Sequence, residues 1–283
     1  MISERFDTGF APAKINLTLH ITGQRSDGYH LLDSLVAFAT VGDQLHAQPA
    51  PEFGLSVTGP EALGVPEDDS NLILRAARLC DGPPLRFHLE KNLPTASGIG
   101  GGSSDAAAAV RLMNAPFDRA QMLALGADIP MCLTPVTAHV QGIGGNITAV
   151  PDLPDMHAVL VNPRISVSTP AIFKALTSKD NSPMSIMPEG PGDFLPWLAD
   201  QRNDLQKPAE NLFPEITQAL SEMQNTGPDL TRMSGSGATC FALYTTANPA
   251  QAAAQDLLQT HPDWWVKSCI LGSIKTQNAR QNG

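Results

Sequence analysis

The sequence predicts an α+β protein, because segments with the period of strands alternate with segments with the period of helices. Residues 14–22 alternate strictly between polar and apolar side chains, which is the pattern of a half-buried strand. Four glycines and Pro94 interrupt the segment 92–102, and a strong helix former follows at 106–113. The last third mixes short apolar runs with helical patterns, which favours a small α+β unit there.

The other elements are predicted from the same two periods. Residues 35–41 and 85–90 are predicted strands, and Ser70 is the expected N-cap of a helix that carries apolar residues up to Leu79. The strand at 14–22 places Lys14 and Asn16 on one face, pointing away from the core. The segment 178–196, rich in Ser, Pro, Gly and Met, is a predicted loop. In the last third we predict strands at 158–161, 240–244 and 266–271, and helices at 170–176, 213–223 and 249–258.

The length of 283 residues allows two modest domains. Pro151 and Pro154 bracket a polar segment, so we place a boundary there. We expect an N-terminal domain at 1–152 and a C-terminal domain at 153–283.

Composition argues against several classes of function. The net charge is −10 and no basic stripe is present, so nucleic acid is not an expected partner. The four cysteines are scattered, which disfavours disulfides and a structural zinc site. The first residues lack the order of a signal peptide, and no apolar run reaches the roughly 18 residues of a membrane span. A cytoplasmic location is expected.

The run from residue 98 to residue 104, GIGGGSS, suits a phosphate group. Glycines let backbone N–H groups converge on a phosphate, and the helix that follows adds its positive dipole end. The run is neither a Walker A loop nor a dinucleotide fingerprint, and it could instead be a flexible connection. Asp105, in the first helical turn, is expected to offset the helix dipole.

Lys14 and Asp128 are candidate catalytic residues. Taken singly, Lys14 fits a solvated surface lysine, and Asp128 fits a helix cap or an exposed turn. Together with the glycine run they suit phosphoryl transfer, which depends on positioning and electrostatic stabilisation. An aspartate can orient the acceptor hydroxyl and a nearby lysine can hold it ionised. A serine of the glycine run could bind the metal that bridges the nucleotide phosphates.

Another Gly/Ser cluster lies at residues 232–239, RMSGSGAT, before an apolar strand. It could be a tight turn or a second backbone wall near the phosphates, and its spacing leaves both open.

These motifs resemble the GHMP kinase superfamily. The resemblance rests on PAKINL at 12–17, PTASGIGGGSSDAAA at 94–108 and MSGSGATCFALY at 233–244. Three further stretches are similar to one branch, the 4-diphosphocytidyl-2-C-methyl-D-erythritol kinases: ITGQRSDGYHLLDSL at 21–35, DSNLILRAARL at 69–79 and LGADIPMCL at 125–133. The resemblance implies a ribosomal-protein-S5-like N-terminal domain, a ferredoxin-like C-terminal domain and an active site between them.

The resemblance also implies an activity and roles for residues. The activity is ATP-dependent phosphorylation, with Mg²⁺, of the 2-hydroxyl of a cytidine diphosphate substrate in isoprenoid biosynthesis; a homodimer is left open. Lys14 and Asp128 match the catalytic pair. The ATP site is matched by Asn71, Pro94, Thr95, Ala96, Ser97, Gly98, Ile99, Gly100, Gly101, Gly102, Ser103 and Ser104. The substrate site is matched by Asn16, Tyr29, His30, Thr169, Pro170 and Phe173.

The cytidine-side residues make chemical sense without the resemblance. A neutral imidazole both donates and accepts, so His30 could read a base edge, and Tyr29 offers a face for stacking. Without the resemblance, a histidine whose hydrogen bonds are made within a turn is the preferred interpretation of His30. Two departures from the family pattern stand out: the segment 113–126 is short, and Thr95-Ala96-Ser97 replaces a glycine-rich start. Two alternatives follow: a homoserine- or mevalonate-type GHMP kinase, or a non-catalytic nucleotide-binding relative.

Overall fold

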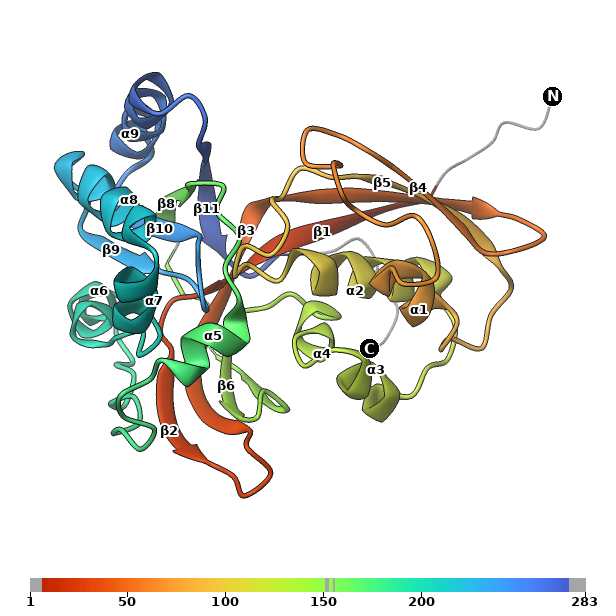
Figure 1. Cartoon of the computed structure of the whole chain (residues 1–283), viewed down its shortest axis with the longest axis horizontal. Helices are drawn as coiled ribbons and strands as arrows, with labels where there is room; N and C mark the ends of the chain where they lie inside the picture. Colours follow the sequence, from red (N-terminus) through yellow and green to blue (C-terminus); the bar gives the residue numbers. More distant parts are fainter. Residues whose placement is uncertain (1–6, 151–152, 155, 275–283) are drawn as a thin grey trace.

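The computed structural model describes residues 7–150, 153–154 and 156–274. Strand β3 (His30–Pro49) is its longest element, with 20 residues, and it runs through both halves of the molecule (Figure 1). It pairs antiparallel with β1 (Asp7–Asn16), β2 (His20–Gln24), β5 (Leu85–Glu90) and β6 (Ala138–Gly142). Strand β4 (Gly54–Thr58) lies parallel to β5, and β7 (Asn146–Ala149) pairs with β6. The helices of this half are α1 (Leu72–Ala77), α2 (Gly101–Met113), α3 (Arg119–Leu125) and α4 (Ile129–Cys132).

The C-terminal half has the β-α-β-β-α-β order of a ferredoxin-like unit. Its elements are β8 (Met156–Asn162), α8 (Pro214–Asn225), β9 (Leu230–Met233), β10 (Cys240–Tyr244), α9 (Ala247–Thr260) and β11 (Trp265–Gly272). The strands are ordered β11-β8-β10-β9, and β11 also pairs with β3 at Leu271 and Ala39, so one sheet continues through both halves. Three helices stand between β8 and α8: α5 (Thr169–Lys174), α6 (Pro191–Asp200) and α7 (Gln206–Leu212).

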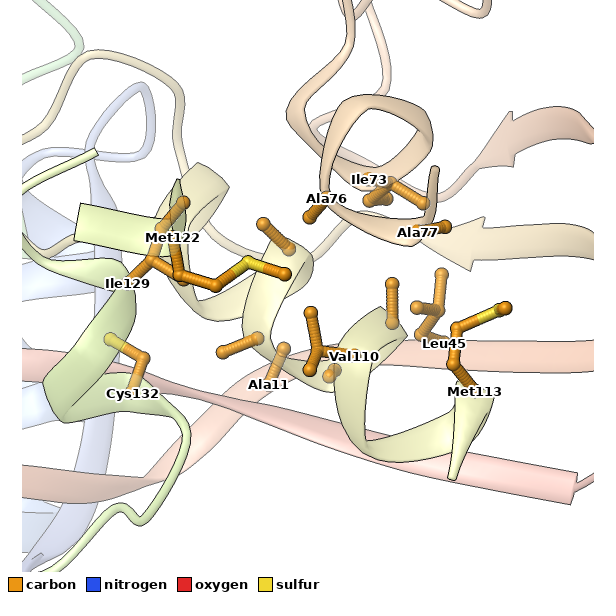
Figure 2. Close-up of a cluster of buried hydrophobic side chains, with 14 of the residues drawn as sticks. Ala11, Leu45, Ile73, Ala76, Ala77, Val110, Met113, Met122, Ile129 and Cys132 are labelled. Carbon is orange, nitrogen blue, oxygen red and sulfur yellow. The ribbon is translucent and has the colours of Figure 1, made fainter. Parts of the chain in front are cut away.

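Helix α2 is fixed by a core of small side chains. Residues 106–109 are four alanines, all fully buried. Figure 2 shows Val110 and Met113 of α2 beside Leu45 of β3, with α1 packed against the helix through Ile73 and its neighbours. Alanine side chains let a helix approach its neighbours closely with little loss of side-chain entropy. The N-terminus of α2, where the glycine run ends, is therefore held rigidly.

Several predictions about local structure are wrong in detail. The predicted strand 14–22 is broken between Asn16 and His20, because the backbone N–H groups of Leu17 and Thr18 both donate to one carbonyl of β3, that of Leu35. The N-cap of α1 is Asn71, not Ser70: its side chain accepts from the backbone N–H of Ile73 at 2.9 Å.

Two boundaries also differ. Helix α2 begins at Gly101, five residues before the alanine-rich run, because the glycines there take helical dihedrals. The predicted loop 178–196 gives way to α6 from Pro191 onwards. The predicted domain boundary at 152/153 includes residue 152, which lies outside the described residues, and stays a prediction. In the described part of the chain, no helix has the length and apolar character to cross a lipid bilayer.

Candidate active site

The glycine run leads from β5 into α2, and it contacts β1 on one side and the loop 234–239 on the other. The backbone N–H of Lys14, in β1, donates to the carbonyl of Ile99 at 2.9 Å. Gly98 has φ +75, and a Cβ there would lie 2.6 Å from the carbonyl oxygen of Gly237. Only glycine allows both that dihedral and that close approach. The loop 234–239 therefore supports the glycine run from behind, and it is not a free turn.

A cavity of about 520 Å³ opens in front of the glycine run. Ten of the twelve residues matched to the ATP site line it; the other two, Ile99 and Ser104, are fully buried. Other residues of the lining were not predicted to bind nucleotide: Gly64, Val65, Pro66, Ser70, Leu72, Lys91, Asp105 and Val167. Thr169, which the family resemblance matches to the substrate site, also lines the cavity. Those at 64–66 carry no motif, and only the fold brings them here.

Lys14 and Asp128 form an ion pair, with Nζ and Oδ2 3.0 Å apart. A solvated Lys14 is therefore not observed: the lysine is 6% exposed, whereas the Asp128 side chain is 41% exposed. Asp128 precedes α4 but its side chain makes no cap to that helix. The short segment between α2 and α4, with α3 in it, still brings Asp128 to β1. A Cβ on Gly100 would lie 3.3 Å from the Cβ of Lys14, so the pair lies beside the glycine run.

Asn16 lies two residues farther along β1. Its backbone N–H donates to Ser234 Oγ at 3.0 Å, and its side-chain amide donates to Ser34 Oγ at 2.8 Å. Asn16 Oδ1 is buried and has no hydrogen-bond partner in the described part of the chain. A buried acceptor without a partner is costly, so it fits a ligand hydroxyl.

His30 stacks on Phe173 of α5, with ring centroids 4.7 Å apart and an interplanar angle of 26°. Its Nε2 is buried and has no hydrogen-bond partner among the described residues. Burial, and then the charge of Lys179, lower the pKa of His30, so the ring is neutral at pH 7. His30 is therefore not a histidine whose ring nitrogens are both hydrogen-bonded within a turn. Tyr29 is 63% exposed in the β2–β3 hairpin.

The remaining substrate-side residues lie on α5. Thr169 begins this helix and its hydroxyl is 2.7 Å from that of Ser236, and Pro170 follows it. Thr169 also lines the cavity in front of the glycine run. The segment therefore lies between the cavity and the stacked rings of His30 and Phe173.

Two serines, Ser103 and Ser104, lie in the first turn of α2. Ser104 Oγ is buried with no hydrogen-bond partner in the residues that the structure describes. Mg²⁺ usually keeps several water and phosphate ligands and needs few from protein, so one hydroxyl suffices. No group of three or more His, Cys, Asp or Glu side chains suited to a metal occurs in the described ranges. The hydroxyl of Ser104 is thus unpartnered but does not line the cavity, whereas Ser103 does.

Asp105 does not act as a simple partner of the helix dipole, which corrects the expectation from sequence. It belongs to a buried triad in which Lys91 Nζ donates to Asp43 Oδ2 and, at 2.8 Å, to Asp105 Oδ2. Asp43 Oδ1 accepts from the backbone N–H groups of Asn92 and Leu93, whereas Asp105 Oδ1 has no partner among the described residues. Burial, with the nearby Asp43 carboxylate, raises the pKa of Asp105 well above its usual range. One lysine thus faces two carboxyl groups, and the raised pKa of Asp105 favours the protonated form of that carboxyl group.

Comparisons with known proteins agree with this geometry. Two family descriptions match the chain, "GHMP kinases N terminal domain" at residues 71–143 and "GHMP kinases C terminal" at 189–263. A protein of Roseobacter denitrificans named 4-diphosphocytidyl-2-C-methyl-D-erythritol kinase is 54% identical over 278 residues, and the match covers 93% of each chain. A protein of Ruegeria pomeroyi with the same name is 51% identical over 280 residues, covering 94% of this chain and 98% of that protein.

Solved structures give the same result. A crystal structure of 4-(cytidine 5'-diphospho)-2C-methyl-D-erythritol kinase superposes with a TM-score of 0.80 at 32% identity, covering 95% of this chain and 100% of the other. A homoserine kinase from Cytophaga hutchinsonii, at 16% identity and a TM-score of 0.68, shares the fold. With half of its residues identical over nearly its whole length, this chain belongs to the 4-diphosphocytidyl-2-C-methyl-D-erythritol kinase family of the GHMP small-molecule kinases.

Proposed function

We propose that the protein transfers the γ-phosphoryl group of ATP to the 2-hydroxyl of 4-diphosphocytidyl-2-C-methyl-D-erythritol, a step of non-mevalonate isoprenoid precursor biosynthesis. The observation that carries the proposal is the Lys14–Asp128 ion pair beside the glycine run, at 3.0 Å. It provides a carboxylate for the acceptor and a cation for the transferring group next to a phosphate-binding loop. Membership of the family supports the choice of substrate.

The nucleotide is assigned to the cavity in front of the glycine run. Backbone N–H groups of residues 98–104 and the N-terminus of α2 would bind the phosphates. Asn71, at the start of α1, would lie near the adenine, because it lines the same cavity. A serine of the glycine run would hold Mg²⁺, and Ser103 is the one that lines the cavity; the ion neutralises phosphate charge when it is bound.

The acceptor is assigned to the other side of the Lys14–Asp128 pair. Asp128 accepts or orients the proton of the 2-hydroxyl while the oxygen forms its bond to the γ-phosphorus and the bond to ADP breaks. Lys14 fixes the carboxylate and faces the charge on the transferring group. The free oxygen of Asn16 would accept a hydrogen bond from another hydroxyl of the substrate.

The cytidine is assigned to the region around the β2–β3 hairpin and α5. The unpartnered Nε2 of His30 would bind the base edge, and the rings of Tyr29 and Phe173 would stack on the base. Thr169 and Pro170 would lie between the base and the phosphates.

The test is a phosphorylation assay with the purified protein, ATP, Mg²⁺ and a panel of acceptors, with products assigned by ³¹P NMR. A new monophosphate on the cytidine substrate, and none on homoserine or mevalonate, is the expected result. ATP turnover on homoserine or mevalonate instead would assign the protein to another GHMP activity. Absence of turnover with every acceptor would make it a non-catalytic relative.

His30 gives a specific prediction for the cytidine side. His30→Ala is expected to raise KM for the cytidine substrate about tenfold, because the base loses a hydrogen bond in a site built for it. KM for ATP should stay within about twofold of the parent, since His30 does not line the nucleotide cavity. Steady-state kinetics with each substrate varied in turn measures both. Tyr29→Phe, which keeps the stacking face, is the matched control; an unchanged KM in His30→Ala would remove this residue from recognition.

The other parts of the proposal are broader. We propose that the enzyme works in the cytoplasm and that residues 1–152 and 153–283 are its two domains, with the substrates bound between them. Analytical ultracentrifugation would decide between a monomer and a homodimer.

A further inference from the structure

An ion pair joins two walls of the nucleotide cavity. Arg164 NH2 donates to Glu61 Oε1 at 2.7 Å, and Arg164 NH1 donates to Glu61 Oε2 at 2.8 Å. The Glu61 side chain is 7% exposed and that of Arg164 is 44% exposed. A two-point contact between guanidinium and carboxylate, half removed from water, is stronger and more directional than an ordinary surface pair.

The two residues belong to different walls. Glu61 lies in the segment 59–72, which lines the cavity through Gly64, Val65, Pro66, Ser70, Asn71 and Leu72. Arg164 lies in the segment 163–169, which lines it through Val167 and Thr169. Within the described ranges, the two hydrogen bonds of this pair are the ones that join these segments. The cavity walls are thus connected here by side chains and not by backbone.

Each partner is anchored in its own half of the molecule. The backbone N–H of Glu61 donates to the carbonyl of Lys91 at 3.1 Å, just after β5. The backbone N–H of Arg164 donates to Asn162 Oδ1 at 2.7 Å, at the end of β8. Val167, three residues after Arg164, is buried in the C-terminal core. A movement of one half relative to the other would therefore act on this pair.

The backbone of Arg164 lies in the left-handed region, with φ +59. A residue other than glycine in this region costs about 1 kcal/mol or more of conformational free energy. Glycine at this position would remove that cost, yet it would also remove the guanidinium. The position thus combines an unfavourable backbone conformation with a two-point ion pair, as expected where a side chain has a function of its own.

We propose that Glu61 and Arg164 form a clasp that holds the two walls around the bound nucleotide and limits the rate at which ADP leaves. The proposal rests on the proposed function, since it requires the nucleotide to occupy this cavity. The walls are joined by the two hydrogen bonds of the clasp, so any parting of the walls breaks both of them. Glu61 and Arg164 are positioning residues, because they act through the walls and not on the reacting atoms.

The test is the substitution Arg164→Gly in the full-length protein. Glycine accepts φ +59 without strain, but it leaves the buried Glu61 carboxylate without its guanidinium, so the dissociation rate and not the melting temperature decides the role of the pair. Stopped-flow displacement of a fluorescent ADP analogue by excess ATP should show dissociation about tenfold faster than in the parent. KM for the cytidine substrate should be unchanged. A purely structural role would lower the melting temperature and leave the dissociation rate alone.

Two controls make the result specific. Arg78→Gln breaks the 2.7 Å pair between Arg78 and Asp69, which does not connect the two walls, and should leave ADP dissociation at the parental rate. Glu61→Gln should speed dissociation, and combining it with Arg164→Gly should add little, because both remove the same interaction. The clasp alone is overturned if ADP leaves Arg164→Gly at the parental rate. It is also overturned if the effects of Glu61→Gln and Arg164→Gly on that rate are fully additive in the double variant. A parent protein from which ATP displaces no ADP analogue overturns the nucleotide assignment and the clasp with it.

Discussion

Replacing Asp128 by asparagine is expected to lower kcat at least about 100-fold, the scale of general acid–base contributions. Asparagine keeps the shape of the side chain but can neither accept the hydroxyl proton nor pair with Lys14 as an anion. KM for ATP should change little, because Asp128 does not line the nucleotide cavity. Steady-state kinetics together with nucleotide titration separates the two effects.

Asp118→Asn provides a matched control for the loss of a carboxylate. Asp118 caps α3 through a hydrogen bond to the backbone N–H of Ala120 at 2.8 Å, and asparagine also caps well. Its kcat should equal that of the parent. Turnover near the parental level in Asp128→Asn would remove Asp128 from the chemistry and leave the pair with Lys14 a structural role.

The buried triad gives the largest expected effect on stability. Asp43→Asn is expected to destabilise the fold by up to about 3–5 kcal/mol, because Lys91 loses one of its two buried carboxyl partners and Asp105 must release a proton to replace it. Asp43 also accepts two backbone N–H groups at the start of the segment that leads to the glycine run. Urea unfolding at pH 7 measures the loss.

Asp105→Asn should behave in the opposite way, although Asp105 contacts the same lysine. Because burial raises the pKa of Asp105, the folded state binds a proton that the unfolded chain, with its usual pKa of 3.8, releases. The parent therefore loses stability as pH rises from 3.8 through the raised pKa, by up to about 1.4 kcal/mol per pH unit. Asparagine has no proton to release, so its free energy of unfolding should not fall in this way. The difference in stability in favour of Asp105→Asn should therefore grow as pH rises from 3.8 through the raised pKa. Unfolding curves of both proteins from pH 4 to 8 check the sign; a variant that becomes weaker as pH rises would show that Asp105 is ionised in the fold.

Patterns that depend on neighbouring residues in the chain were predictable. The alternation in β5, the short apolar run of β10, the alanine-rich run of α2 and the glycines before it each express a local preference of the backbone. The three motifs at 12–17, 94–108 and 233–244 together predicted the family, and the comparisons confirm it. The roles given to Lys14, Asp128, His30 and the glycine run remain predictions that the experiments above address.

Other features depended on contacts between distant residues. The sequence alone determined the α+β class, the loop that precedes α2 and the residue types of the candidate site. Only the tertiary structure decided that Lys91 would lie between Asp43 and Asp105, that residues 64–66 would line the cavity, and that Glu61 would meet Arg164. The physical reason is that the charge and burial of a side chain depend on which partners the fold brings within hydrogen-bond distance, and Glu61 and Arg164 are separated by 103 positions.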